Sequence, residues 1–212
     1  MCGRYANHVD VTSEWLDILK DWPAGISTGF NIAPTQTIPA IREDGTFPMR
    51  WGLVPAWSKE ASPRYATFNA RLESASEKPT FRNAWHHAQT CLIPALGYYE
   101  WRTEQGVKQP YFVQAPAQMG LLVFAGLWEL REGAYSCTIL TRESAGDLAQ
   151  LHSRMPVMLA PDDARSWLTE GCRAADRLWE SSIHQDLQYH AVGRAVGNTH
   201  NQGEVLIQPI RK

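Results

Sequence analysis

The first residues of the chain hold the most reactive combination of groups in the sequence. The chain begins Met1-Cys2-Gly3-Arg4, and the small side chain of Cys2 permits removal of Met1. Cys2 would then carry a free α-amine and a thiol on adjacent carbons, titrating near ~8 and ~8.5, so that both supply some nucleophile at neutral pH. An aldehyde would form an imine with the amine, and the sulfur would close a five-membered thiazolidine. Taken alone, the same residues also fit an ordinary buried cysteine.

Two later stretches are suited to binding. Asn69-Ala70-Arg71 separates an amide from a guanidinium by one residue, so both side chains share a face if the segment is extended. The stretch 192–203 is a run of glycine and asparagine whose turns could bring backbone close to a ligand.

Two other stretches are suited to proton transfer. Glu100 stands among aromatic residues in Gly97-Tyr98-Tyr99-Glu100-Trp101, an environment that raises the pKa of a carboxyl group. His152-Ser153-Arg154 joins an imidazole that titrates near neutral pH to an arginine suited to phosphate. Each of these groups alone also has a structural interpretation, as an edge carboxylate or a hydrogen-bonded histidine.

The sequence lacks the motifs of several other chemistries. It contains no GxGxxG or GxxxxGK[ST] loop for nucleotides and no GxSxG nucleophile elbow. Its seven histidines form no HExxH motif and no Cys/His ligand spacing. We therefore expect neither a metal site nor a cofactor.

Composition indicates an ordinary globular protein. The chain has 212 residues, 44% of them hydrophobic, and a formal net charge of −2. We expect one domain over residues 1–212, in which any nucleic-acid binding comes from a local basic patch. The four cysteines have no CxxC spacing, and no leader or long apolar run is present. This favours a cytoplasmic protein with reduced thiols and no membrane partner.

Hydrophobic periodicity and turn residues predict many strands and a few helices. Helices are expected at 12–20, 79–88, 144–151, 162–169 and 174–180, and an irregular stretch at 31–35. Strands are expected at 38–42, 47–53, 90–95, 97–102, 110–113, 121–130, 134–141, 189–192 and 205–208, with turns at 43–45, 104–106 and 131–133. A loop is expected from 54 to 67. Because strands dominate without βαβ alternation, we predict an α+β fold with a largely antiparallel sheet or partial barrel flanked by short helices.

Taken together and in order, the polar motifs resemble one family. The chain resembles the SOS-response-associated peptidase (SRAP) family of abasic-site processing proteins along essentially its whole length. The motifs that carry the resemblance are Met1-Cys2-Gly3-Arg4, Asn31-x-Ala33-Pro34, Trp51-Gly52, Asn69-Ala70-Arg71-x-Glu73, Gly97 to Trp101, His152-x-Arg154-Met155-Pro156, and Asn198 with Asn201. The resemblance implies the SRAP fold and covalent capture of abasic sites in single-stranded DNA through Cys2.

The resemblance also implies roles for single residues. Cys2 would be the nucleophile, Asn69 would orient the ring-opened sugar or the cysteine amine, and Glu100 and His152 would transfer protons. The residues expected to contact DNA phosphates are Arg4, Arg71 and Arg154, with Asn31, Pro34 and Thr141 nearby. Trp51 and Trp57 are expected to stack on bases or to wedge against a duplex end.

The expected partner is single-stranded DNA with abasic sites, including sites at single-strand/double-strand junctions, bound by a monomer that is nucleoid-associated when on DNA. Two other functions suit the same residues. Cys2 could act with His152 and Glu100 as an N-terminal nucleophile that cleaves peptide bonds, including its own bond to Met1. Alternatively, the protein binds single strands without a covalent bond, and Cys2 is incidental.

Overall fold

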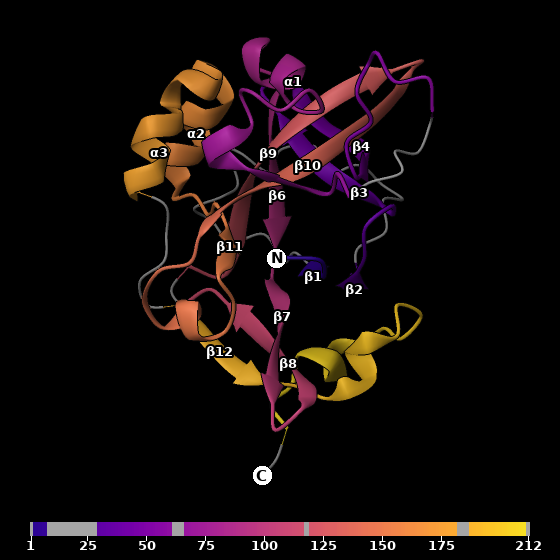
Figure 1. The fold of residues 1–212 in the computed structure, drawn as a ribbon, viewed down its shortest axis with the longest axis vertical. Coiled ribbons are helices and arrows are strands. Elements are labelled where there is room, and N and C mark those ends of the chain that lie inside the picture. Colours follow the sequence, from indigo (N-terminus) through magenta and orange to yellow (C-terminus); the bar gives the residue numbers. More distant parts are fainter. Residues whose placement is uncertain (1, 8–28, 61–65, 117–118, 182–186, 211–212) are drawn as a thin grey trace.

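Strand β1 (Tyr5–Asn7) lies near the middle of the molecule, with a barrel above it and the rest of its own, smaller sheet below (Figure 1). This computed structural model describes residues 2–7, 29–60, 66–116, 119–181 and 187–210. The helix expected at 12–20 lies outside these residues, as does part of the loop expected at 54–67.

The smaller sheet contains β1 and is antiparallel throughout. Its strand order is β12 (Gln188–Ala191), β8 (Val107–Gln114), β7 (Gly97–Glu104), β1 and β2 (Gly29–Ile32). Strands β7 and β8 form a hairpin whose two turn residues, Gln105 and Gly106, have φ values of 47° and 81°. Positive φ at both positions is the backbone of a type I′ turn, which matches the twist of the flanking strands. The turn predicted at 104–106 is thereby confirmed.

The second sheet closes into a partial barrel. Its strands are β3 (Thr37–Arg42), β4 (Gly45–Trp51), β5 (Asn69–Arg71), β6 (Thr90–Ala95), β9 (Leu122–Arg131), β10 (Ala134–Glu143) and β11 (Arg154–Pro156). Strand β10 pairs with β9 along one edge and with β4 along the other, so the path β4, β3, β6, β9 returns to β10. Farther along, β10 also pairs with β5 and β11.

Short helices and single helical turns lie outside the two sheets. They are α1 (Arg82–His86), α2 (Pro161–Glu170) and α3 (Ala175–Ser181), with single turns at η2 (Leu72–Ser74), η3 (Gly146–Gln150), η4 (Gly171–Ala174), η5 (Arg194–Gly197) and η6 (Glu204–Ile207). In α2, Trp167 is fully buried, and its indole N–H lies 3.2 Å from the carbonyl oxygens of both Cys91 and Gly126. These contacts fix α2 to β6 and β9.

The predicted α+β class with a partial barrel is confirmed, and most strands lie where expected. Two predictions are wrong. Residues 205–207 belong to the helical turn η6 rather than to a strand, because Leu206 packs with Val192 and Val196 against the smaller sheet. Residues 31 and 32 belong to β2 rather than to an irregular stretch, because they pair with β1. Strands β1 and β11 were not predicted.

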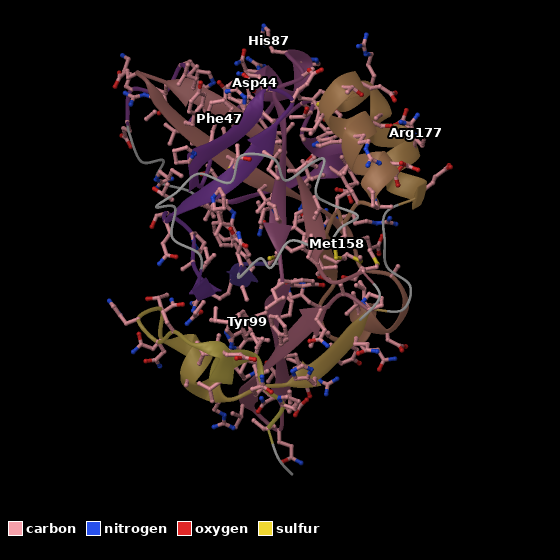
Figure 2. The ribbon with its side chains drawn as sticks, turned by 180° about the vertical axis from the view of Figure 1, so that it is seen from behind. Asp44, Phe47, His87, Tyr99, Met158 and Arg177 are labelled. Atoms are coloured by element: carbon pink, nitrogen blue, oxygen red, sulfur yellow. The ribbon has the colours of Figure 1, made fainter. Side chains whose placement is uncertain are left out.

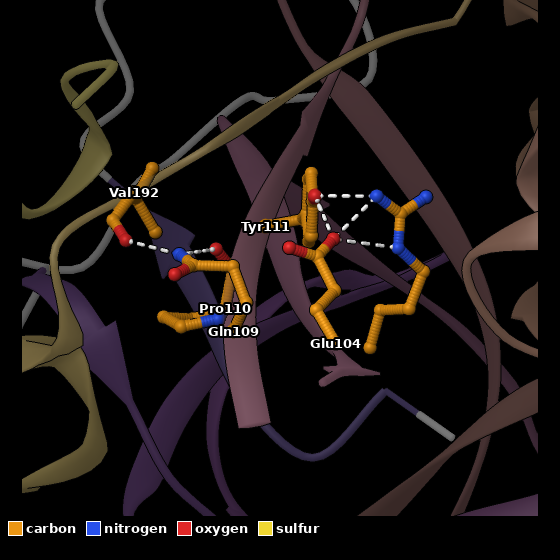
Figure 3. A network of polar contacts seen from close by, with 6 residues as sticks. Glu104, Gln109, Pro110, Tyr111 and Val192 are labelled. Carbon is orange, nitrogen blue, oxygen red and sulfur yellow. Dashed lines mark hydrogen bonds and ion pairs between the residues drawn. The ribbon is translucent and has the colours of Figure 1, made fainter. Parts of the chain in front are cut away.

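The C-terminal segment is tied to the smaller sheet by side-chain hydrogen bonds. The Gln109 side chain on β8 donates to the carbonyl oxygen of Val192 over 2.8 Å (Figure 3). Beside it, Arg102 and Glu104 of β7 form an ion pair, and both contact the hydroxyl of Tyr111. The segment from Val192 to Ile207 thereby covers the face of the sheet that carries Tyr99 and Phe112.

Arg42 fills one end of the barrel. Ile38 and Ala40 on β3 are fully buried, and Arg42 follows them at the period of two that directs side chains to one face. Its guanidinium carbon lies 4.3 Å from the ring centre of Phe47, 4.1 Å from that of Trp128 and 5.1 Å from that of Tyr135. Figure 2 labels Phe47 and Asp44 at this end. Stacking on three rings stabilises the cation and excludes water from the barrel interior.

We expect Arg42→Leu to lower the free energy of unfolding by about 2 kcal/mol, because it removes the cation from three aromatic faces. Urea denaturation would measure this loss. The matched control is Asp44→Ala, which removes the ion-pair partner of Arg42. The Asp44 side chain is 59% exposed, so this loss should stay below about 1 kcal/mol. Equal losses in the two variants would contradict a role for the ring contacts.

Candidate functional site

Pairing between β1 and β7 brings Cys2 to Glu100. Tyr5 lies opposite Tyr98 in this antiparallel pair, and the backbone N–H of Tyr99 donates to the carbonyl oxygen of Arg4 over 2.9 Å. Continuing this register toward the N-terminus carries the chain along β7 in the direction of Glu100. Cys2 is 0% exposed and Glu100 is 4% exposed. The nucleophile and the carboxylate predicted from the sequence therefore lie together in the protein interior.

The surroundings of Cys2 keep its thiol protonated. Burial raises the pKa of the Cys2 thiol, and the negative charge of Glu100 raises it further. The sulfur contacts the carbonyl oxygen of Arg4 at 3.9 Å, too weak an interaction to offset burial. At neutral pH the resting group is a thiol, and reaction through sulfur requires a base.

Tyr98 also belongs to this site, although no role was expected for it from the sequence. Burial raises the pKa of the Tyr98 hydroxyl, and the charges of Cys2 and Glu100 add to the effect, which reflects their proximity. Tyr98 and Glu100 are two residues apart on β7 and so point to the same face. That alternation was visible in the sequence and could have identified Tyr98.

Asn69 holds the backbone of Cys2. Strand β5 runs parallel to β10, with Asn69 beside Ile139, which directs the amide toward the N-terminal segment. The Asn69 side-chain N–H donates to the carbonyl oxygen of Cys2 over 2.7 Å. The other end of the amide, Oδ1, is buried and accepts no hydrogen bond from the residues that the structure describes. An acceptor therefore remains at Asn69 for an N–H group.

The His152 ring is fixed by the backbone of the following turn. Its Nδ1 accepts a hydrogen bond of 2.9 Å from the backbone N–H of Arg154. The same Nδ1 also lies 3.2 Å from the carbonyl oxygen of Arg154, so both backbone groups of Arg154 hold the ring. His152 follows η3 and precedes β11, so it lies on a short connection between two ordered elements.

Three of the residues expected to bind phosphate meet on neighbouring strands. Thr141 on β10 lies opposite Arg71 of β5 on one side and Pro156 of β11 on the other. Arg154 donates to the carbonyl oxygen of Thr141 over 2.6 Å and forms an ion pair with Glu73. Arg71 is exposed. These contacts make a basic edge of the barrel, to which Arg142 of β10 also belongs.

Arg4 and Asn31 hold the glycine and asparagine run against the face of the smaller sheet that carries Tyr99. Arg4 donates to the Asn31 side-chain oxygen and to the carbonyl oxygen of Val196, each over 2.7 Å. The Asn31 amide donates to the carbonyl oxygens of Val196, Asn198 and Asn201 over 3.2, 2.9 and 2.9 Å. Asn31 is 0% exposed, so its amide acts here inside the protein. Burial lowers the pKa of Arg4, while the partners named here carry no charge.

The two tryptophans expected to stack on bases are placed differently. Trp51 is 0% exposed, donates to the carbonyl oxygen of Phe68 over 2.9 Å and meets the Tyr5 ring edge-on at 5.2 Å. It therefore offers no face to a base in this structure. Trp57 is 58% exposed. Pro34 is half-buried in a turn next to Thr35, whose φ of 77° is unusual for a β-branched residue.

Within the described ranges, no cluster of three or more histidine, cysteine, aspartate or glutamate side chains could hold a metal ion. Of the helices in those ranges, none is both long and apolar enough to cross a membrane.

Comparison with known proteins identifies the family. Residues 1–199 match the family model described as "SOS response associated peptidase (SRAP)". The chain is 34% identical to the abasic site processing protein YoaM of Bacillus subtilis over 98% of this chain and 97% of that protein. It is 30% identical to YedK of Escherichia coli, covering 99% and 100%, and 33% identical to HMCES of Pongo abelii, covering 99% and 76%. A crystal structure from Bordetella bronchiseptica superposes with a TM-score of 0.78 at 26% identity, covering 91% of this chain and 100% of that one. The chain belongs to the SOS response associated peptidase family.

Proposed function

We propose that this protein processes abasic sites in single-stranded DNA by joining Cys2 covalently to the opened sugar. The observation that supports this most is the burial of Cys2 beside Glu100, with the Cys2 carbonyl held by Asn69. Cys2 is the second residue, so removal of Met1 would create an α-amine at this position. The relatives named above are called abasic site processing proteins. An abasic sugar in its open form carries the aldehyde that an aminothiol captures.

The first step is imine formation by the Cys2 amine. The amine attacks the C1′ aldehyde, the resulting hydroxyl is protonated, and water leaves as the C=N bond forms. Asn69 Oδ1 can accept an N–H of the amine and direct its lone pair to the aldehyde, because the same amide already fixes the Cys2 carbonyl. Glu100 and His152 are the proposed proton donors.

The second step is closure of the thiazolidine by sulfur. The Cys2 thiol adds to the imine carbon, its proton passes to Glu100, and the ring nitrogen is protonated in return. Because burial and Glu100 keep the sulfur protonated at rest, transfer of the thiol proton must accompany the attack. Glu100 thus serves as acid in the first step and as base in the second.

The basic edge of the barrel supplies the proposed DNA contacts. A protein with net charge −2 needs a local excess of positive charge to bind phosphates. Arg71, Arg142 and Arg154 provide it near Asn69 and His152, while Arg4 carries its charge among neutral partners. Trp57 is the exposed aromatic residue proposed to stack on a base.

Removal of Met1 by the same site is a second proposed activity. The family is described as a peptidase, and the bond in question immediately precedes Cys2, whose carbonyl Asn69 already holds. Cys2 would attack the Met1 carbonyl, and Glu100 would take the thiol proton and pass it to the leaving amine, which gives a Met1 thioester on the Cys2 sulfur. Water would then hydrolyse this thioester, releasing Met1 and restoring the thiol.

We expect Cys2→Ala to abolish the covalent adduct with a uracil-excised single-stranded oligonucleotide, because alanine supplies no sulfur to close the ring. Denaturing electrophoresis after heating would measure the adduct. Binding of the intact strand should be unchanged, which serves as the control. An adduct of equal heat stability in wild type and variant would contradict the mechanism. Equal binding of intact and abasic strands without any adduct would instead favour the non-covalent function.

We expect Glu100→Gln and His152→Ala each to slow adduct formation by about 100-fold, the usual contribution of one general acid or base, with DNA affinity preserved. Timed quenching on denaturing gels gives the rate, and fluorescence anisotropy gives the affinity. The intact mass of each variant shows whether Met1 has been removed and so separates slow chemistry from a blocked amine. Rates equal to wild type in a variant that has lost Met1 would exclude the assigned proton transfer.

We expect alkylation of the native protein by iodoacetamide to begin at Cys172. Burial raises the pKa of the Cys172 thiol to about 12, but this residue is only half-buried, whereas Cys2, Cys91 and Cys137 are fully buried. Below its pKa, the thiolate fraction rises about tenfold per pH unit, so labelling of Cys172 should do the same from pH 7 to 9. Peptide mass spectrometry measures each site. Glu100→Gln should speed labelling of Cys2 only; faster labelling of Cys2 than of Cys172 in wild type would contradict the described burial.

A further inference from the structure

Arg154 already holds an anion in the free protein. Its two terminal nitrogens donate to the two carboxylate oxygens of Glu73 over 2.7 and 2.9 Å. This is the two-pronged geometry with which a guanidinium also binds two oxygens of a phosphate. From the other side, the carbonyl oxygen of Thr141 accepts a hydrogen bond of 2.6 Å from the same guanidinium. The Arg154 position is therefore set by β10, and Glu73 occupies its anion-binding side.

Glu73 is the carboxylate that pairs with Arg154, in a cluster that also holds Arg71, Arg142 and, opposite Arg154 in the β10–β11 pair, Glu143. Strand pairing aligns Arg71 on β5 with Thr141 on β10, next to Arg142 and across from the β11 residues that begin with Arg154. Partial burial tends to raise the pKa of Glu73, but the hydrogen bond from Arg154 and the charges of Arg154 and Arg71 outweigh it and lower the pKa. Burial lowers the pKa of Arg142, and the negative charge of Glu73 raises it in part. The carboxylate is thus charged at neutral pH and cancels part of the local positive charge.

The two members of the ion pair differ in exposure. The Arg154 side chain is 14% exposed, and that of Glu73 is 36% exposed. Glu73 lies in the single turn η2, where the exposed side of the carboxylate meets solvent. The carboxylate can therefore turn outward while Thr141 keeps the guanidinium in place.

We infer that Glu73 occupies the site of a DNA phosphate in the free protein, and that a strand phosphate displaces it from Arg154 when DNA binds. This inference rests on the proposed function and adds a residue that sets its specificity. The exchange replaces one anion at Arg154 by another, so it weakens binding to any single strand, damaged or not. Stable retention would then depend on the covalent step at Cys2, which only an abasic sugar supports.

The test measures non-covalent binding of a fluorescent, undamaged single-stranded oligonucleotide by anisotropy at several KCl concentrations, using the full chain. Glu73→Gln should bind about three- to tenfold more tightly than wild type, because Arg154 is no longer neutralised. The slope of log affinity against log salt should stay within about 0.7 of the wild-type slope, the value for one phosphate contact on a single strand, because the same phosphate reaches Arg154 in both proteins. Glu73→Ala should behave alike, which guards against a folding defect in either variant.

The matched control is Glu132→Gln. Glu132 also pairs with an arginine, Arg131, over 2.8 Å, but it lies in the turn between β9 and β10 and its side chain is 74% exposed. Its loss should leave affinity and slope unchanged. Combining Glu73→Gln with Arg154→Ala should remove the gain.

Affinity equal to or weaker than wild type in both Glu73 variants would overturn the inference and make Glu73 a structural clamp for Arg154. If wild type nevertheless binds the strand and forms the abasic adduct, the proposed function stands and only this inference fails. If neither wild type nor variants bind single strands, both fail.

Discussion

The site depends on the pairing of a three-residue strand, β1, with β2 on one side and β7 on the other. The first residues of a chain usually fray, because few contacts hold them. Here main-chain hydrogen bonds fix β1, and Asn69 fixes the Cys2 carbonyl just before it. These contacts give Cys2 a fixed position, which the proposed capture of an aldehyde requires.

The same burial that positions Cys2 makes it unreactive. Desolvation and the charge of Glu100 both disfavour the thiolate. A small electrophile therefore meets a neutral thiol, which is a poor nucleophile. In the proposed mechanism, Glu100 takes the thiol proton only as the sulfur attacks a carbon electrophile that is already in place. Under the proposed function, the buried site gives up general nucleophilicity and gains selectivity for an aldehyde that has entered it.

Sequence patterns predicted the long strands, because their buried apolar runs extend over enough residues to be recognised. The strand at 90–95 has the predicted bounds. Strands β1 and β11 have three residues each, too few for a period, and they exist because neighbouring strands pair with them. The motif resemblance grouped Cys2, Asn69 and Glu100, and in the structure these three residues lie close together. It could not show that Trp51 is internal, since an aromatic residue suits a core and a base-stacking surface equally.

The arginines of the molecule show why net charge alone says little about DNA binding. Arg154 is matched by Glu73, while Arg4 is held by the oxygens of Asn31 and Val196, which carry no charge. A guanidinium bound to neutral acceptors keeps its full charge and still has a fixed position, and one bound to a carboxylate keeps its position but loses most of its field. Two arginines assigned the same role from sequence thus differ electrostatically. The difference lies in their partners, which come from segments far away in the chain.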